Sequence, residues 1–195
     1  MPTWAKLVAL ALLVLLASVG LLHSSFVQNG DIAKPNLVET DANEVDARKP
    51  VADFALTGLD GAVKHLSDYR GQVVLLSFWA SWCGPCLEEL PTFAELQSKL
   101  NGRGFVVLPI NLDDGDEGKT FSKEFWVKKK LPFSSFFDGK KEIAAQFEVD
   151  MLPSNFVLDR QGRLVFSGVG ATDWMKAETL EMIEGLLAES ATASN

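Results

Sequence analysis

The feature that most constrains this chain is an uninterrupted apolar segment followed almost at once by two closely spaced cysteines. Residues 73–79 read VVLLSFW and residues 83–86 read CGPC. A short apolar run without polar alternation predicts a strand buried on both faces, as in a parallel or mixed sheet. An apolar stripe with helical spacing follows, so the cysteines fall where this strand passes into a helix. We therefore expect a sheet that is covered by helices.

The rest of the chain alternates between strand and helix patterns, with hairpin-turn signals at residues 60–61 (DG) and 159–162 (DRQG). Thr172 is the expected N-cap of the closing helix. The expected strands are 54–56, 63–66, 73–79, 105–111, 155–158 and 164–166, and the expected helices are 84–100, 120–130, 140–147 and 174–187. This order predicts an α/β domain with a central mixed sheet flanked by helices.

The composition excludes several classes of protein. Apolar residues make up 47% and charged residues 23% of the 195 residues, which is typical of a globular protein. The net charge of −8 lacks the basic footprint of a nucleic-acid binder, so no nucleic-acid partner is expected. Two cysteines are too few for a disulfide framework in a chain of this size, so we expect them to act chemically.

The N-terminus is a separate segment, in which residues 7–22 carry no charge and follow a single lysine, Lys6. As a helix this run spans ~24 Å, against ~30 Å for the hydrocarbon core of a bilayer. Two interpretations remain open: a signal anchor over residues 1–22 that is retained as one transmembrane helix, or a cleaved signal peptide. The basic start fits the positive-inside rule. We expect a single-pass inner-membrane protein with its domain in the periplasm or another extracytoplasmic space.

Three further parts complete the predicted organisation. Residues 23–50 are polar, lack apolar periodicity and are expected to form a linker that holds the domain away from the bilayer. Residues 51–189 are expected to form the folded domain. Residues 190–195 are expected to be a disordered tail.

The cysteine pair has the pattern of a redox site. Cys83 is expected at a helix N-terminus, where free N–H groups and the helix dipole favour a thiolate. Cys86 is expected one turn further on and more buried. Half of a metal site is the alternative, but neither histidine, His23 or His65, has the spacing of a zinc partner. No metal site is therefore expected.

Residues 73–86 resemble the active-site strand and turn of the thioredoxin superfamily. Residues 51–54 (VADF), 66–71 (LSDYRG) and 86–91 (CLEELP) are similar to its TlpA/ResA branch of membrane-anchored, extracytoplasmic thiol-disulfide oxidoreductases. The resemblance covers residues 51–187. It implies a thioredoxin-like three-layer fold with an N-terminal β-hairpin extension, and a redox-active disulfide without a cofactor.

The resemblance also implies catalytic roles. Cys83 matches the nucleophile and Cys86 the resolving thiol. Glu89 matches an acid near the cysteines that accepts the proton of Cys86, although it could instead be a solvated carboxylate like Glu88. Ser77 stands where thioredoxin has a buried aspartate, which makes Glu89 the more interesting acid.

Five other residues are implied in substrate binding. Pro153 matches a cis-proline that faces the disulfide, and Leu152 before it would line a groove with its backbone groups. Trp82 would shield Cys83, or would simply pack. Gly84 and Pro85 complete the predicted surface.

The implied partners are proteins with disulfides or thiols, and a membrane thiol carrier as the electron donor. We expect the reduction of partner disulfides. A disulfide oxidase or isomerase, and a copper-site assembly factor acting on cytochrome or oxidase partners, remain alternatives. Residues 151–155 (MLPSN) depart from the Gly-x-Pro-Glu-Thr of cytochrome-maturation reductases, which weakens the case for a cytochrome c substrate. A peroxidase is disfavoured because it needs a lone peroxidatic cysteine in a different loop.

Overall fold

The computed structural model describes residues 48–189. The predicted signal anchor, the predicted tail and all but the last three residues of the predicted linker lie outside this range. Within it, no helix is both long and apolar enough to cross a membrane. The last linker residues are bound to the domain, because Arg48 pairs with Glu189 at 2.8 Å and with Asp159 at 3.3 Å.

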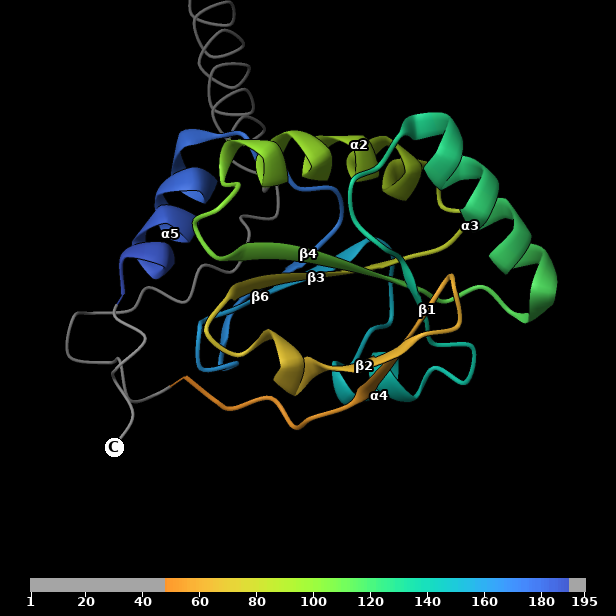
Figure 1. The fold of residues 1–195 in the computed structure, drawn as a ribbon, viewed down its shortest axis with the longest axis horizontal. Helices are drawn as coiled ribbons and strands as arrows, with labels where there is room; N and C mark the ends of the chain where they lie inside the picture. Colours follow the sequence, from red (N-terminus) through yellow and green to blue (C-terminus); the bar gives the residue numbers. More distant parts are fainter. Residues whose placement is uncertain (1–47, 190–195) are drawn as a thin grey trace, which may run out of the picture. The chain divides into compact units, whose positions relative to one another are not determined.

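A mixed sheet of seven strands forms the centre of the described domain, in the order β2-β1-β5-β4-β3-β6-β7 (Figure 1). The strands β3, β4 and β5 are parallel, and the remaining pairings are antiparallel. The strands are β1 (Ala55–Gly58), β2 (Val63–His65), β3 (Val73–Trp79), β4 (Phe105–Asn111), β5 (Phe136–Phe137), β6 (Ser154–Leu158) and β7 (Leu164–Val169). The predicted α/β class with a central mixed sheet and an N-terminal hairpin is confirmed.

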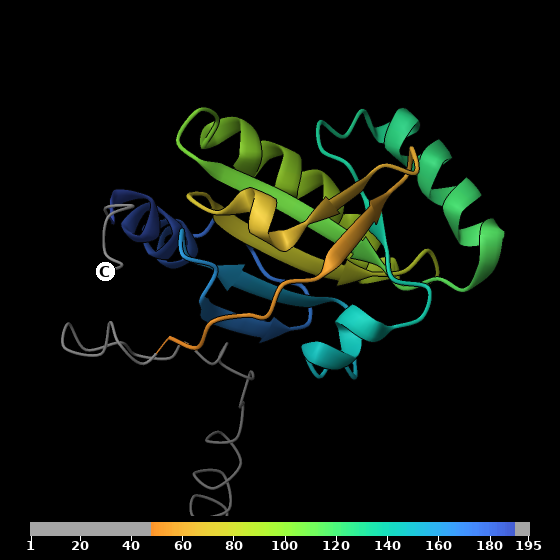
Figure 2. The same ribbon diagram turned by 60° about the horizontal axis from the view of Figure 1, so that its bottom comes forward.

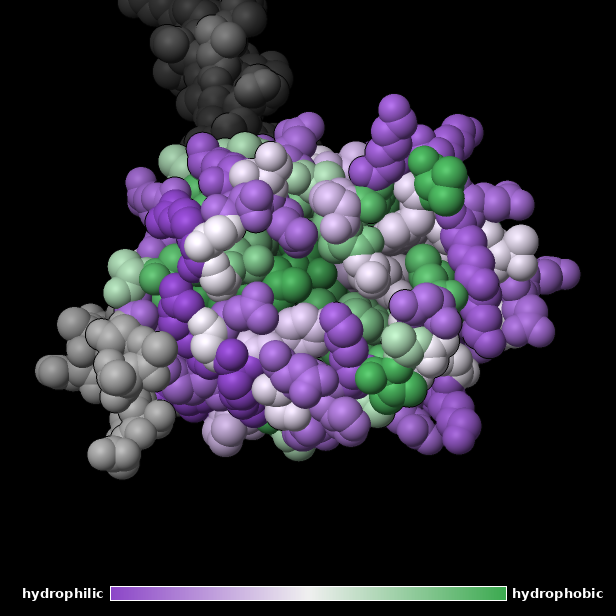
Figure 3. Space-filling view, viewed as in Figure 1, coloured by the Kyte–Doolittle hydropathy of each residue, from purple (hydrophilic) through white to green (hydrophobic). Residues whose placement is uncertain are grey.

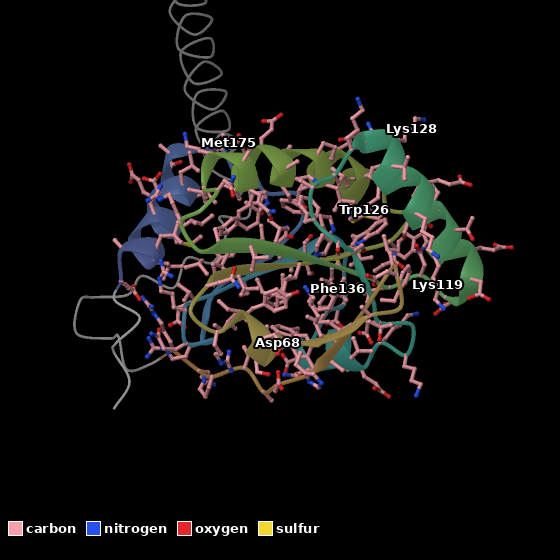
Figure 4. The ribbon with its side chains drawn as sticks, in the orientation of Figure 1. Asp68, Lys119, Trp126, Lys128, Phe136 and Met175 are labelled. Carbon is pink, nitrogen blue, oxygen red and sulfur yellow. A yellow bond between two sulfur atoms is a disulfide. The ribbon has the colours of Figure 1, made fainter. Side chains whose placement is uncertain are left out.

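Helices cover both faces of this sheet, giving three layers (Figures 1 and 2). The helices α2, α3 and α5 pack on one face, and η1 and α4 pack on the other. Their bounds are η1 (Leu66–Tyr69), α2 (Gly84–Lys99), α3 (Gly115–Lys129), α4 (Glu142–Gln146) and α5 (Ala177–Ala188). Figure 4 shows Lys119 and Lys128 of α3 pointing outward, while Trp126 points into the domain.

Strand β3 lies inside the sheet, between β4 and β6, and is buried along its whole length. Leu75 and Trp79 face the hydrophobic cluster beneath α2, whereas Leu76 and Phe78 face the cluster beneath η1 and α4. This alternation between two apolar layers is why the sequence of β3 shows no polar period. In the space-filling view, hydrophilic residues cover the outside of α3 and hydrophobic residues gather towards the middle of the same face (Figure 3).

Three expectations are corrected by the structure. The strand β5 has only two residues and was not expected. Helix α3 begins at Gly115 rather than at residue 120. Thr172 is not the N-cap of the closing helix, because α5 is capped at Lys176 and the Thr172 backbone N–H donates instead to Glu89.

Candidate active site

The cysteine pair lies at the turn that joins β3 to α2. The Cys83 N–H donates to the Ala80 carbonyl at 3.1 Å, which closes a tight turn after the strand. Cys83 is the N-cap of α2, and its Sγ accepts the backbone N–H of Cys86 at 3.3 Å. Pro85 stands in the first helical turn, where its missing N–H costs nothing. The attacking sulfur predicted from the sequence is therefore held at a helix N-terminus.

Cys83 and Cys86 are joined by a disulfide, with 2.03 Å between the sulfur atoms. Both side chains are buried, with exposed fractions of 5% for Cys83 and 1% for Cys86. The neighbouring residues are exposed instead: Trp82 is 74% exposed, and Gly84 and Pro85 also face solvent. Trp82 therefore does not pack in the core, and it marks a surface beside a buried disulfide.

The segment before β6 supplies the other predicted binding residues. Leu152 is half-buried and packs against the hydrophobic cluster that contains both cysteines. Pro153 is buried, and the peptide bond between Leu152 and Pro153 is cis. The Pro153 carbonyl accepts the N–H of Gly170 at 2.8 Å, which fixes this segment against the chain that follows β7.

Glu89 lies one turn after Cys86 and is 4% exposed, whereas Glu88 faces solvent. Its carboxylate accepts the N–H of Thr172 at 2.9 Å and the indole Nε1–H of Trp174 at 2.8 Å. The Asn155 amide donates to both of its oxygens, at 3.0 and 3.2 Å. Glu89 is therefore not the solvated carboxylate that the sequence left open.

Burial raises the pKa of Glu89 above its ordinary value, because an ionised carboxylate loses hydration inside the protein. The hydrogen bonds from Thr172, Trp174 and Asn155 oppose this rise. An open cavity of about 350 Å³ lies against Glu89, lined also by Pro85, Glu88, Thr92 and residues 171–175. Met175, labelled in Figure 4, belongs to this lining. Open space therefore lies beside a carboxyl group that is itself buried.

A second buried carboxylate supports the active-site turn, and sequence reasoning missed it. Asp113 is 7% exposed and accepts the Ser81 N–H at 3.0 Å and the Ser81 hydroxyl at 3.1 Å. It also accepts the Asn111 amide at 2.8 Å. The sequence did hold a signal for this contact. Ser81 follows the predicted strand β3 and Asp113 follows the predicted strand β4, and polar residues at the ends of parallel neighbouring strands meet at one edge of the sheet.

The three partners of Glu89 were also missed. Asn155 and Trp174 read as ordinary strand and helix residues, and Thr172 was assigned to a helix cap. They lie between 66 and 85 residues from Glu89 along the chain, so no local spacing connects them. Within residues 48–189, no group of three or more His, Cys, Asp or Glu residues is arranged to hold a metal ion.

Comparisons with known proteins agree with this geometry. The model of the AhpC/TSA family matches residues 47–167. The thiol-disulfide oxidoreductase ResA of Bacillus cereus is 31% identical over 147 residues, covering 75% of this chain and 80% of that protein. The ResA of Geobacillus kaustophilus is 32% identical over 154 residues, covering 78% of this chain and 80% of that protein.

Solved structures that are similar to this chain also include thiol-disulfide oxidoreductases. A candidate thiol:disulfide interchange protein DsbE from Chlorobium tepidum superposes with a TM-score of 0.65 at 34% identity, covering 72% of this chain and 97% of that one. A secreted thiol-disulfide isomerase from Corynebacterium glutamicum superposes with a TM-score of 0.67 at 25% identity, covering 77% and 90%.

Proposed function

The chain belongs to the AhpC/TSA family and is a thiol-disulfide oxidoreductase similar to ResA, and from this premise we propose that it reduces disulfides of partner proteins outside the cytoplasm. The observation that carries the proposal is the hydrogen bond from the Cys86 N–H to the Cys83 sulfur at the start of α2. A donor at this place stabilises negative charge on Cys83 in the reduced protein and makes it the attacking thiolate.

The first step joins the enzyme to its partner. The Cys83 thiolate attacks one sulfur of the partner's disulfide, forms a mixed disulfide and expels the other partner sulfur as a thiolate. The exposed Trp82, with Gly84 and Pro85, provides the surface on which the partner docks. Leu152 and Pro153 line the opposite side of the proposed groove.

The second step releases the partner. Cys86 loses its proton to Glu89 and attacks the Cys83 sulfur, so that the Cys83–Cys86 disulfide forms and the second partner sulfur leaves as a thiolate. Two electrons pass to the partner in total. Glu89 suits this role as a general base because it lies one turn from Cys86, has a raised pKa and borders a cavity open to solvent. Protons captured there can leave through the cavity.

The buried acid also supports the direction of exchange. An ionised Glu89 near the thiols disfavours a thiolate on Cys86. Strong disulfide oxidants depend on a strongly stabilised reduced form, so a carboxylate that opposes part of the stabilisation given by the helix N-terminus makes the site a better electron donor. A reductase in an oxidising compartment must be reduced again, and we propose a membrane thiol carrier as the donor. The apolar residues 7–22 would hold the enzyme at the same membrane as that carrier.

Two measurements test this function. Equilibration of the domain with glutathione should give a potential near that of thioredoxin, about −270 mV, whereas a value near about −120 mV would indicate an oxidase. In cells, Cys86→Ser should trap partners as mixed disulfides on Cys83, and Cys83→Ser is the matched control that should trap none.

The membrane location has its own test. Fractionation, a carbonate wash of the membranes and N-terminal sequencing should find the whole chain in the membrane fraction. A soluble product that begins near Leu21 would replace the anchor by a cleaved signal peptide.

A further inference from the structure

Asn155 is buried beside Glu89 with the oxygen of its side-chain amide unpaired. It is 0% exposed, and its Nδ2 group donates to both oxygens of Glu89. Its Oδ1 atom is buried and has no hydrogen-bond partner. Buried acceptors are rarely left without a donor because they have lost their hydration, so an orphan of this kind calls for a physical explanation.

The orientation of this amide is fixed by its neighbour. A carboxylate accepts hydrogen bonds and has no hydrogen to donate, so the amide must turn its nitrogen towards Glu89. The opposite orientation would place an amide oxygen against two carboxylate oxygens. The orphaned Oδ1 of Asn155 therefore points away from Glu89.

The fold places Asn155 beneath the first turns of α2. Asn155 of β6 is paired across the sheet with Ser77 of β3. Ser77 lies on the same face of β3 as Leu75 and Trp79, which is the face that α2 covers. Cys86 precedes Glu89 by one helical turn on α2 and faces the same cluster.

We propose that the Asn155 oxygen is an acceptor reserved for the thiol of Cys86. In the disulfide, the Cys86 sulfur is bonded to Cys83 and carries no hydrogen. When two electrons and two protons reduce the disulfide, the bond between the sulfurs breaks and each sulfur gains one hydrogen, although the hydrogen on Cys83 is readily lost. The buried Cys86 thiol then donates to Oδ1. Asn155 is thus a positioning residue that favours the dithiol over the disulfide.

This inference rests on exchange through Cys83 and Cys86 and holds for either direction of exchange. One planar amide would contact Glu89 through its nitrogen and Cys86 through its oxygen. The side chain would therefore hold the resolving thiol and its proposed base in a fixed relation. A leucine of similar size at this position could hold neither.

The main test is the equilibrium constant of the domain with glutathione. Asn155→Leu should disfavour the dithiol by about threefold to tenfold, the effect of a modest hydrogen bond. The same substitution in a Glu89→Gln background should keep this shift. If the shift disappears in that background, Asn155 acts only through Glu89 and the inference is overturned. Equal destabilisation of the oxidised and reduced forms in urea would mean a merely structural role and would overturn it too.

A spectroscopic test does not depend on that variant folding well. In Cys83→Ser the only thiol is Cys86, so the infrared S–H stretching band reports on its hydrogen bond. We expect a band shifted to lower frequency than a free thiol, and a return towards the free position in Cys83→Ser with Asn155→Ser. A band already at the free position in Cys83→Ser would overturn the inference. The reduction potential of the unmodified protein tests the proposed direction of exchange. The proposed function and the hydrogen bond between Cys86 and Asn155 can therefore fail separately.

Discussion

Two buried carboxylates, Asp113 and Glu89, support the two sides of the cysteine pair and are held by different partners. Asp113 supports the turn before Cys83 through Ser81, and its other partner, Asn111, lies two residues away. Glu89 follows Cys86 and is held by residues from β6 and from the segment before α5. Of these two buried carboxylates, Glu89 belongs to the lining of the cavity described above and Asp113 does not. The difference separates an acid that holds the turn from one that borders an open cavity, as the proposed proton acceptor of Cys86 must.

The largest expected effect tests the chemical side of this comparison. Glu89→Gln should slow the resolution of a mixed disulfide on Cys83 by about a hundredfold, since general-base catalysis commonly contributes this much. Glutamine keeps the size of the side chain and one acceptor oxygen while removing the basicity. Stopped-flow exchange with a model disulfide across pH measures the rate. Glu88→Gln is the matched control, because Glu88 borders the same cavity but is exposed, whereas Glu89 is buried. An unchanged pH profile in Glu89→Gln would remove Glu89 from the site.

The next effect tests the structural side. Asp113→Ala should lower the free energy of unfolding by about 2 kcal/mol, because the buried Asn111 amide and the Ser81 N–H lose their acceptor. Urea unfolding of the oxidised domain measures this. Asp114→Ala changes an exposed neighbour and should cost much less. Equal losses in the two variants would show that the Asp113 network does not support the turn.

A smaller effect follows from the raised pKa of Glu89. Its folded pKa lies above the unfolded value, so the folded state binds the proton more tightly than the unfolded state. The stability that this linkage contributes is present below the ordinary glutamate pKa of 4.5 and is lost as pH rises through the folded pKa. The parent should therefore lose stability relative to Glu89→Gln over that interval in urea unfolding. A constant difference between the two proteins from acid to neutral pH would contradict a raised pKa.

The smallest expected change in stability is at Trp82. Trp82→Ala should alter the free energy of unfolding by less than about 0.5 kcal/mol, because the side chain is 74% exposed. It should nevertheless slow exchange with a protein disulfide more than exchange with a small disulfide. Equal slowing with both substrates would mean that Trp82 acts on Cys83 and not on docking.

The bounds of a strand or helix could be predicted from the sequence where one physical pattern dominates the segment. Strands β3 and β4 begin and end at the predicted residues, because a strand buried on both faces is apolar throughout. The strand β5 has two residues, too few for any period to show. The first turn of α3, Gly115 to Gly118, carries no apolar spacing, so its start was placed too late.

In the candidate site too, features that depend on local spacing could be predicted from the sequence, and features that depend on distant segments could not. The helix N-terminus at Cys83 and the position of Glu89 after Cys86 follow from local spacing. The burial of Glu89 does not, since it depends on Thr172 and Trp174 returning to α2 from a distant part of the chain. Asp113 lies between these cases, because Asn111 is two residues away while Ser81 is distant in sequence but adjacent in any sheet where β3 and β4 are parallel.

The ion pair between Arg48 and Glu189 joins the first and last residues that the structure describes, at 2.8 Å. The ion pair therefore brings positions 48 and 189 together at one place on the domain. We expect a fusion that enters at residue 48 and leaves at residue 189 to keep the sheet intact, because the two positions already lie together. Fusions at Arg48 and Glu189 should leave the turn at Cys83 intact. The domain should therefore keep its thiol-disulfide chemistry within another protein.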